Sequence, residues 1–237
     1  MLLLLRHLYH VPVAYDDFWL DSPNTQDPAA QDTSYLLSTR SIVSSEALSQ
    51  PVCVLVHGFS ASTFEFNYFK SAVTERNENI QFSTILMGGH GLNYDAFKAA
   101  SYLDWKQPVI DEVKRLISQG YNNISLLGVS TGATVLLDSI LTGEIDAKNI
   151  RQLIFIDPFV IPQNKLLFLT PYLRFMVSNT RSQASTNLEL THWYVNRPAS
   201  ALIELVSLLT HVRSQINRMP PNFKLPPTSV FAAQYDA

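Results

Sequence analysis

The sequence has little cysteine: Cys53 is the only one in 237 residues, which excludes an internal disulfide framework and a cysteine-rich zinc site. Because Cys53 lies in the apolar run Val52–Val56, we expect a small buried hydrophobe. Long apolar runs are also missing, since no stretch reaches the roughly eighteen residues of a membrane-spanning helix. The apolar run at residues 1–5 is cut by Arg6 and His7 and lacks the layout of a secretory signal. We therefore expect no transmembrane span and a cytoplasmic location.

Positively charged residues do not outnumber negatively charged ones either. Lysine and arginine number 17 against 20 aspartates and glutamates, which gives a formal net charge of −3. A nucleic-acid partner would need a basic face, so we expect none. Hydrophobic residues make up 46% and charged residues 16%, a balance that excludes intrinsic disorder. The chain also lacks internal repeats and low-complexity tracts. The sequence does not indicate an oligomeric state.

From residue 52 onward, short apolar runs alternate with amphipathic segments. The expected strands are Val52–Val56, Phe82–Met87, Ile124–Leu127, Leu153–Ile156 and Thr228–Ala232, with a less regular one within Tyr35–Val43. The expected helices are Ser62–Asn77, Asp104–Gln119, Thr131–Leu141 and Ala199–Asn217. This alternation predicts an α/β fold, with a mainly parallel sheet and helices on both faces. The region Pro158–Pro198 breaks the rhythm with large apolar side chains and is interpreted as an insertion that packs over the sheet.

The central motif is Gly128-Val129-Ser130-Thr131-Gly132, which lies between an expected strand and an expected helix. G-x-S-x-G alone is a weak signal, but a strand, a sharp turn and a helix form the nucleophile elbow that presents a reactive serine. The helix N-terminus beside Ser130 adds unpaired backbone donors and a positive dipole end. The alternative is a serine that merely caps a helix.

Two histidine-containing loops follow neighbouring strands. His57-Gly58-Phe59-Ser60 follows the first strand, and Gly88-Gly89-His90-Gly91 follows the second. Acyl transfer needs donors that stabilise an oxyanion, and the backbone N–H groups of Phe59 and Thr131 are the candidates. We interpret His57 and His90 as histidines that hold their loops. Neither has a carboxylate or thiolate at metal-ligand spacing, so no metal and no cofactor are expected.

Together with Asp104-Trp105 and the terminal stretch Ser229–Asp236, these motifs resemble an α/β-hydrolase-fold serine hydrolase, in particular the monoacylglycerol lipase and carboxylesterase group. The resemblance covers residues 51–237 and implies one hydrolase domain, with a lid insertion at 158–198 and an N-terminal segment 1–50 that carries no placed motif. It also implies a Ser–Asp–His triad. Ser130 matches the nucleophile, Phe59 and Thr131 the oxyanion donors, and Asp236 the acid. Asp157, which also ends a strand, is a rival acid.

The sequence departs from this pattern at its end. The triad histidine should follow the acid, but only Ala237 follows Asp236. The last strand, the final helix and the catalytic histidine of the resembled fold are therefore missing. The six histidines lie elsewhere, at positions 7, 10, 57, 90, 192 and 211. Without a base, a serine hydroxyl stays protonated and is a poor nucleophile. The chain is thus expected to be a fragment of a longer reading frame or an inactive relative, and the sequence favours the fragment.

The resemblance implies an enzyme that cleaves carboxylic esters of lipophilic acyl groups, small-molecule substrates, through an acyl-enzyme on Ser130. Aromatic side chains of the insertion are candidates to line its acyl pocket: Phe159, Phe168, Tyr172, Phe175, Trp193 and Tyr194. An acyltransferase or a peptidase would use the same acyl-enzyme. A binding or regulatory relative that keeps the pocket without turnover is the alternative that the missing histidine favours.

Overall fold

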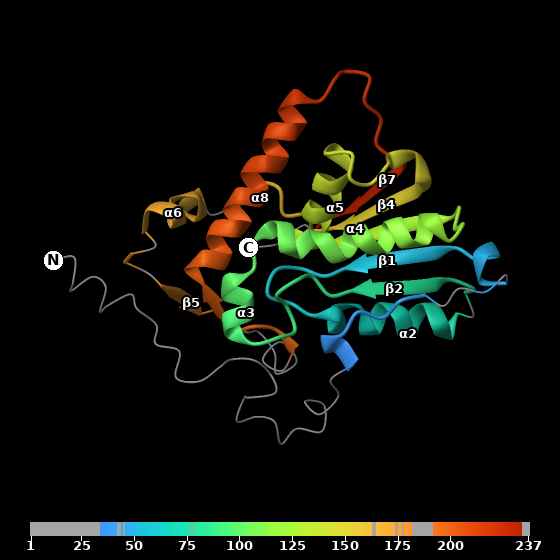
Figure 1. Ribbon diagram of the computed structural model, residues 1–237, viewed down its shortest axis with the longest axis horizontal. Coiled ribbons are helices and arrows are strands. Elements are labelled where there is room, and N and C mark those ends of the chain that lie inside the picture. Colours follow the sequence, from blue (N-terminus) through green and yellow to red (C-terminus); the bar gives the residue numbers. More distant parts are fainter. Residues whose placement is uncertain are drawn as a thin grey trace.

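The computed structural model describes residues 34–41, 44, 46–76, 78–162, 165–173, 175–176, 178–181 and 192–233. Five parallel strands form the central sheet in the order β2-β1-β3-β4-β7 (Figure 1). The strands are β1 (Val52–Val56), β2 (Gln81–Ile85), β3 (Ile124–Val129), β4 (Ile150–Ile156) and β7 (Thr228–Phe231). The predicted α/β fold with a mainly parallel sheet is confirmed, and each strand expected from residue 52 onward is present.

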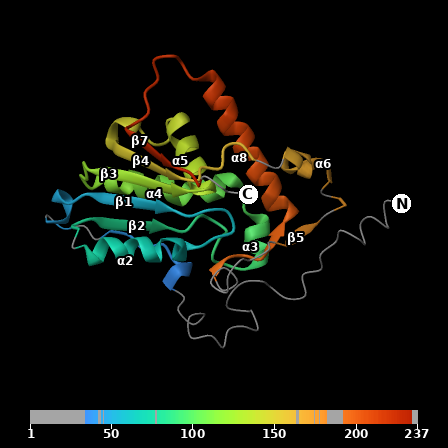
Figure 2. The same cartoon turned by 180° about the vertical axis from the view of Figure 1, so that it is seen from behind.

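The helices fall between the strands, as the alternation predicts. They are α2 (Asn67–Glu75), α3 (Tyr94–Ala99), α4 (Tyr102–Ser118), α5 (Thr131–Leu141), α6 (Thr170–Leu173) and α8 (Ala199–Arg218). Short 3₁₀ helices are η2 (Ser34–Leu36), η3 (Ala47–Ser49), η4 (Thr63–Phe66), η5 (Ala147–Asn149) and η6 (Lys165–Leu169). The long helix α8 runs beside α5, and both views show this arrangement (Figures 1 and 2).

The sheet is covered on both faces, which explains why β1 is apolar throughout. Val52, Val54 and Val56 face a large core with side chains of α4, α5 and α8. Cys53 and Leu55 face a smaller core on the other side, which Phe66 of η4 closes. Burial raises the pKa of the Cys53 thiol to about 12, so this thiol is unreactive and acts as the predicted small hydrophobe.

Helix α4 begins earlier than its apolar pattern indicates because a capping box fixes its start. The Ser101 side chain accepts a hydrogen bond from the Asp104 N–H, and the Asp104 carboxylate accepts one from the Ser101 N–H at 2.8 Å. Pro108 lies inside the helix and removes the N–H that would bond to the Asp104 carbonyl. The backbone of Gly88 approaches that carbonyl so closely that an added Cβ would lie 2.3 Å from its oxygen.

The strand expected within Tyr35–Val43 is wrong for its first half. Tyr35 and Leu36 are consecutive and both buried, a pattern that a strand with alternating faces cannot provide, and they belong to η2. In the second half of this segment, Thr39 forms an isolated antiparallel bridge with Thr84 of β2. Residues 42 and 43 lie outside the described residues.

The region Pro158–Pro198, which we interpret as an insertion, contains several short elements among its described residues. η6, α6 and the hairpin of β5 (Asn179–Arg181) and β6 (Asn196–Pro198) interrupt the alternation between β4 and α8. In Figure 1, α6 and β5 lie at the end of the molecule toward which the strands of the sheet point. The insertion therefore lies at the edge where parallel sheets bind ligands.

A buried ion cluster joins α4 to α5. The Lys106 ammonium contacts the fully buried Asp138 carboxylate at 2.8 Å and the Glu144 carboxylate at 2.6 Å. Burial alone would lower the pKa of Lys106, but its hydrogen bonds to Asp138 and Glu144 raise it above the usual value. Lys106 is therefore the cation that makes a charged Asp138 tolerable inside the protein.

Replacing Lys106 by alanine should lower the free energy of unfolding by about 3–5 kcal/mol, because it leaves the Asp138 charge buried without its partner. Urea denaturation of both proteins measures the difference. Lys114→Ala removes an exposed lysine from the same helix and should change stability by no more than about 0.5 kcal/mol. Equal stability of the two variants would contradict this account of the cluster.

Candidate active site

Ser130 lies at a sharp turn between β3 and α5, with φ 49° and ψ −116°. A residue with a side chain rarely adopts positive φ, so the turn stores backbone strain. The predicted strand–turn–helix geometry is confirmed. Ser130 occupies the N-cap position of α5, but its side chain makes no capping hydrogen bond, which contradicts the alternative of a helix-capping serine.

The two motif glycines permit α5 to start directly against the sheet. A Cβ added to Gly128 would lie 2.5 Å from the backbone nitrogen of Ala133, and one added to Gly132 would lie 2.1 Å from the Val56 carbonyl oxygen. Both distances are far below van der Waals contact with backbone atoms that cannot rotate away. The G-x-S-x-G spacing therefore follows from the packing of the first turn of α5 against β1 and β3.

The loop after β1 lies against Ser130. A Cβ added to Gly58 would be 3.4 Å from the Ser130 Cβ, so Gly58 lies close to the serine. The Gly58 carbonyl accepts hydrogen bonds from His57 Nδ1 at 2.8 Å and from the Ala61 N–H at 3.2 Å. Because the Gly58–Phe59 peptide is trans, its Phe59 N–H points away from these donors.

The two expected oxyanion donors flank the serine. Phe59 follows Gly58 in the loop, and Thr131 is the first residue of α5, where helical N–H groups have no partner within the helix. Within the described parts of the chain, neither the Phe59 nor the Thr131 N–H donates a hydrogen bond. One unused backbone donor therefore belongs to the residue after Ser130 and the other to the residue after Gly58, which lies close to the serine. The N-terminal end of α5 adds a helix dipole that favours negative charge.

His57 and His90 bind the two loops to each other. His57 Nε2 accepts a hydrogen bond from the Met87 N–H at 3.0 Å, and His90 Nε2 accepts one from the Ser60 N–H at 3.3 Å. Burial lowers the pKa of His57 to about 4, and burial together with the nearby His57 lowers the pKa of His90 well below 6.5. Both rings are neutral and engaged, which confirms that they hold their loops.

The imidazole resonances of His57 should therefore not titrate between pH 5 and 8. NMR spectra recorded over this pH range test this prediction, and the resonances that disappear in His57→Gln are those of His57. As the pH falls below 6.5, the unfolded chain binds this proton before the folded protein does. Protonation of His57 in the unfolded chain therefore lowers the free energy of unfolding progressively as the pH falls from about 6.5 to 4. This loss of stability is absent above pH 6.5 and complete below pH 4. A midpoint near 6.5 would contradict a buried, neutral His57.

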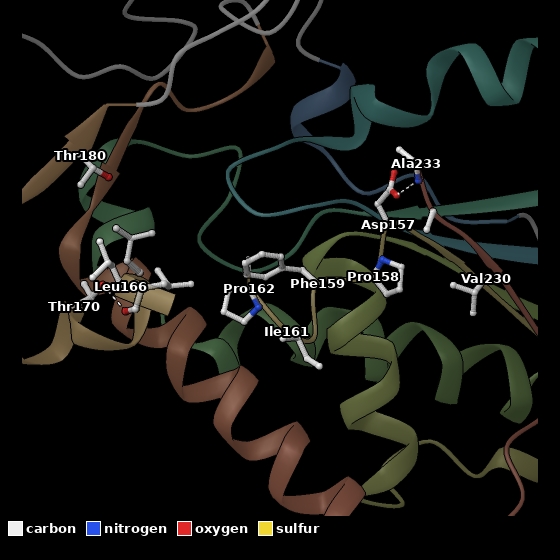
Figure 3. Close-up of a pocket in the computed structure, with 13 residues that line it drawn as sticks. Asp157, Pro158, Phe159, Ile161, Pro162, Leu166, Thr170, Thr180, Val230 and Ala233 are labelled. Carbon is white, nitrogen blue, oxygen red and sulfur yellow. Dashed lines mark hydrogen bonds between the residues drawn. The ribbon is translucent and has the colours of Figure 1, made fainter. Parts of the chain in front are cut away.

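The structure describes only Asp157 of the two candidate acids. Asp236 lies outside the described residues. Asp157 directly follows β4 with φ 44°, and its Oδ1 accepts a hydrogen bond from the Ala233 N–H at 2.7 Å (Figure 3). The preceding residue, Ile156, accepts the hydrogen bond of the Ser130 N–H at 2.9 Å, so Asp157 lies beside the turn.

The structure brings no described histidine into hydrogen-bond contact with Ser130. His192 is buried and its ring stacks on Phe64 at 3.4 Å. His211 lies on α8, where its ring nitrogens lie 3.4 Å from the Tyr102 hydroxyl and 3.0 Å from the Gln215 amide. His7 and His10 fall outside the described residues.

A pocket of about 800 Å³ opens beside Asp157, between the ends of β4 and β7 and the insertion (Figure 3). Its lining is mostly apolar and includes Phe159, Ile161, Pro162, Leu166, Leu167, Leu202 and Val230. The Phe159 N–H donates to the Ser130 carbonyl at 3.3 Å, so this wall of the pocket continues into the turn.

The expectation that the aromatic side chains of the insertion line this pocket is confirmed for Phe159 alone. Tyr194 is fully buried and stacks on Phe97 in the core at 4.6 Å, while Tyr172 and Phe175 are exposed. The Phe168 ring lies 5.7 Å from the Arg213 guanidinium. Leu166 and Leu167, two aliphatic side chains of the same apolar run, line the pocket instead.

No protein-family model matches the chain, and the search of curated proteins finds no match. Among solved structures, a metagenome-derived lipolytic enzyme of the LipS and LipT pair superposes with a TM-score of 0.67 at 14% identity, over 85% of this chain and 77% of that one. The chain has the α/β-hydrolase fold. A monoacylglycerol lipase from Paleococcus ferrophilus gives a TM-score of 0.55 at 11% identity, over 77% of this chain and 74% of that one. Est1E from Butyrivibrio proteoclasticus, solved with ferulic acid, gives a TM-score of 0.52 at 13% identity, over 78% of this chain and 80% of that one.

Two features are absent from the described residues. None of their helices combines the length and apolar character needed to cross a bilayer. Nowhere among them do three histidine, cysteine, aspartate or glutamate side chains gather as metal ligands would.

Proposed function

We propose that this protein is a serine hydrolase that cleaves carboxylic esters of lipophilic acyl groups through an acyl-enzyme on Ser130. The observation that carries the proposal is the strained turn at Ser130, flanked by the unused N–H groups of Phe59 and Thr131. Such a turn costs stability, and strained residues with side chains cluster at functional sites. The neighbouring solved structures include lipases and esterases, which supports ester hydrolysis on this fold.

In the proposed reaction, the Ser130 hydroxyl oxygen attacks the ester carbonyl carbon. The carbonyl oxygen becomes an oxyanion that the Phe59 and Thr131 N–H groups stabilise, helped by the dipole of α5. Collapse of this intermediate breaks the bond to the alcohol oxygen, and the alcohol leaves with the proton that the Ser130 hydroxyl gave up on attack. Water then hydrolyses the acyl-enzyme and releases the acid. Asp236 is the proposed triad acid, with Asp157 as its rival.

The pocket supports the lipophilic part of the substrate. It starts at Asp157 and Phe159, beside the serine, and extends between aliphatic side chains of β7, α8 and the insertion. Burial of an acyl chain among such side chains contributes about 0.8 kcal/mol per methylene group. An acyltransferase would use the same serine and pocket and differ only in the acceptor of the acyl group.

A second candidate function is binding without turnover. It is favoured by the lack of any hydrogen bond between Ser130 and a histidine of the described residues, because an unassisted serine hydroxyl is a poor nucleophile. Such a protein would bind a fatty acid or ester in the pocket and leave it unchanged.

The experiment that separates the two is hydrolysis of p-nitrophenyl butyrate and p-nitrophenyl octanoate, followed by the absorbance of the released nitrophenolate. Turnover above the buffer rate that disappears in Ser130→Ala supports the hydrolase. Saturable binding of octanoate, with nitrophenolate release at the buffer rate, would favour the binding protein.

A further inference from the structure

A carboxylate that the motifs do not include lies beneath the loop after β1. Glu65 belongs to η4, and its Oε2 accepts a hydrogen bond from the Gly58 N–H at 2.7 Å. Its other oxygen, Oε1, faces the α-carbon of Gly58, 3.6 Å from the position of an added Cβ. The same Cβ position is 3.4 Å from the Ser130 Cβ, so the glutamate and the serine both lie next to Gly58.

The two peptide groups on either side of Gly58 are thus held by different side chains. Glu65 binds the N–H of the His57–Gly58 peptide, whereas His57 and the Ala61 N–H bind the carbonyl of the Gly58–Phe59 peptide. With both groups fixed, Gly58 loses the rotational freedom that a glycine otherwise has. The direction of the Phe59 N–H, the candidate oxyanion donor, is then determined.

We propose that Glu65 is a positioning residue for the reaction of Ser130: its carboxyl group holds the Gly58 N–H and thereby fixes the loop that presents the Phe59 N–H beside the serine. The inference rests on the proposed function for its catalytic consequence. The hydrogen bond itself is independent of that function.

The protonation state of Glu65 provides a readout. Burial raises its pKa from 4.5 to about 7, although the hydrogen bond from the Gly58 N–H acts in the opposite direction. No charged side chain contributes to this shift, and His57, the titratable group next to Gly58, is neutral above about pH 4. An ionised Glu65 places negative charge near the position of the oxyanion, which opposes its formation.

The functional test measures the rate at which a fluorophosphonate labels Ser130, from pH 5.5 to 8.5. Glu65→Ala should slow labelling by about a hundredfold at every pH, since the donor loop loses its position. Glu65→Gln keeps an acceptor without the charge. Its rate should equal that of the wild type near pH 5.5 and exceed it several-fold near pH 8.5. Glu75→Gln, an exposed glutamate of α2, is the matched control and should behave as the wild type throughout.

A second measurement does not depend on reactivity or on a variant that folds poorly. In the ¹⁵N-labelled wild-type protein, the Gly58 amide resonance should titrate with a midpoint near 7, and this titration should vanish in Glu65→Gln. A Gly58 amide that does not titrate, or Glu65→Ala labelled as fast as the wild type, would overturn the inference. A wild-type protein that is not labelled at all would refute the proposed function, and the Gly58 titration would then decide alone whether Glu65 holds the loop.

Discussion

Ser130→Ala should abolish ester turnover by this protein. The variant removes the oxygen on which we propose that the acyl-enzyme forms, while the proposed donors of Phe59 and Thr131 and the pocket remain. Loss of a catalytic serine in enzymes of this kind lowers the rate by about six powers of ten when the base is in place. The residual rate should match that of buffer, measured with p-nitrophenyl butyrate and enzyme at high concentration.

The matched control for this variant is Ser125→Ala, five positions earlier in β3, the strand that leads into the turn. It should keep the turnover of the wild type. Both variants should keep the wild-type circular dichroism spectrum, because Ser130 makes no capping bond that alanine would lose. Turnover that survives in Ser130→Ala would place the chemistry on another residue, with His192 and His211 the first to replace.

The second large effect is expected for Gly132→Ala, on stability. The new Cβ would lie 2.1 Å from the Val56 carbonyl oxygen and 2.5 Å from that of His57, and both are backbone atoms. Helix α5 must move away from the sheet to make room, which should lower the free energy of unfolding by about 3 kcal/mol or more. Urea denaturation measures this loss.

Gly120→Ala provides the comparison for Gly132→Ala. Gly120 has φ +92° but open space around its Cβ position, so its substitution tests backbone strain without a clash. We expect it to cost about 1–2 kcal/mol. If Gly132→Ala were as stable as Gly120→Ala, the first turn of α5 would not be packed against β1 as closely as described.

The central strand β1 could be predicted from the sequence because it is a short aliphatic run buried on both faces. Val52–Val56 is predicted with the bounds that the structure gives it, as is helix Thr131–Leu141. The turn at Ser130 could also be predicted, since the glycines on either side permit the close approach that the turn requires. The structure of the segment at Tyr35 could not be predicted. Its two buried side chains, Tyr35 and Leu36, are consecutive and do not alternate as they would in a strand.

The site was predictable to a smaller extent. His57 and His90 are the loop-holding residues that their sequence context suggested. The role of Glu65 has no signal in the sequence, because it depends on a loop that returns η4 beneath Gly58. The pocket lining was missed for a similar reason: which side chains of an apolar run face inward depends on its backbone path. Asp236 stays a prediction.

The measurement that tests the account most directly is mass spectrometry of the protein after reaction with a fluorophosphonate. The account predicts one adduct per chain, on the tryptic peptide that spans residues 116–148, with fragment ions that place it on Ser130. The adduct should be absent in Ser130→Ala. An unmodified wild-type protein after prolonged reaction, or an adduct on any other residue, would contradict a nucleophilic Ser130.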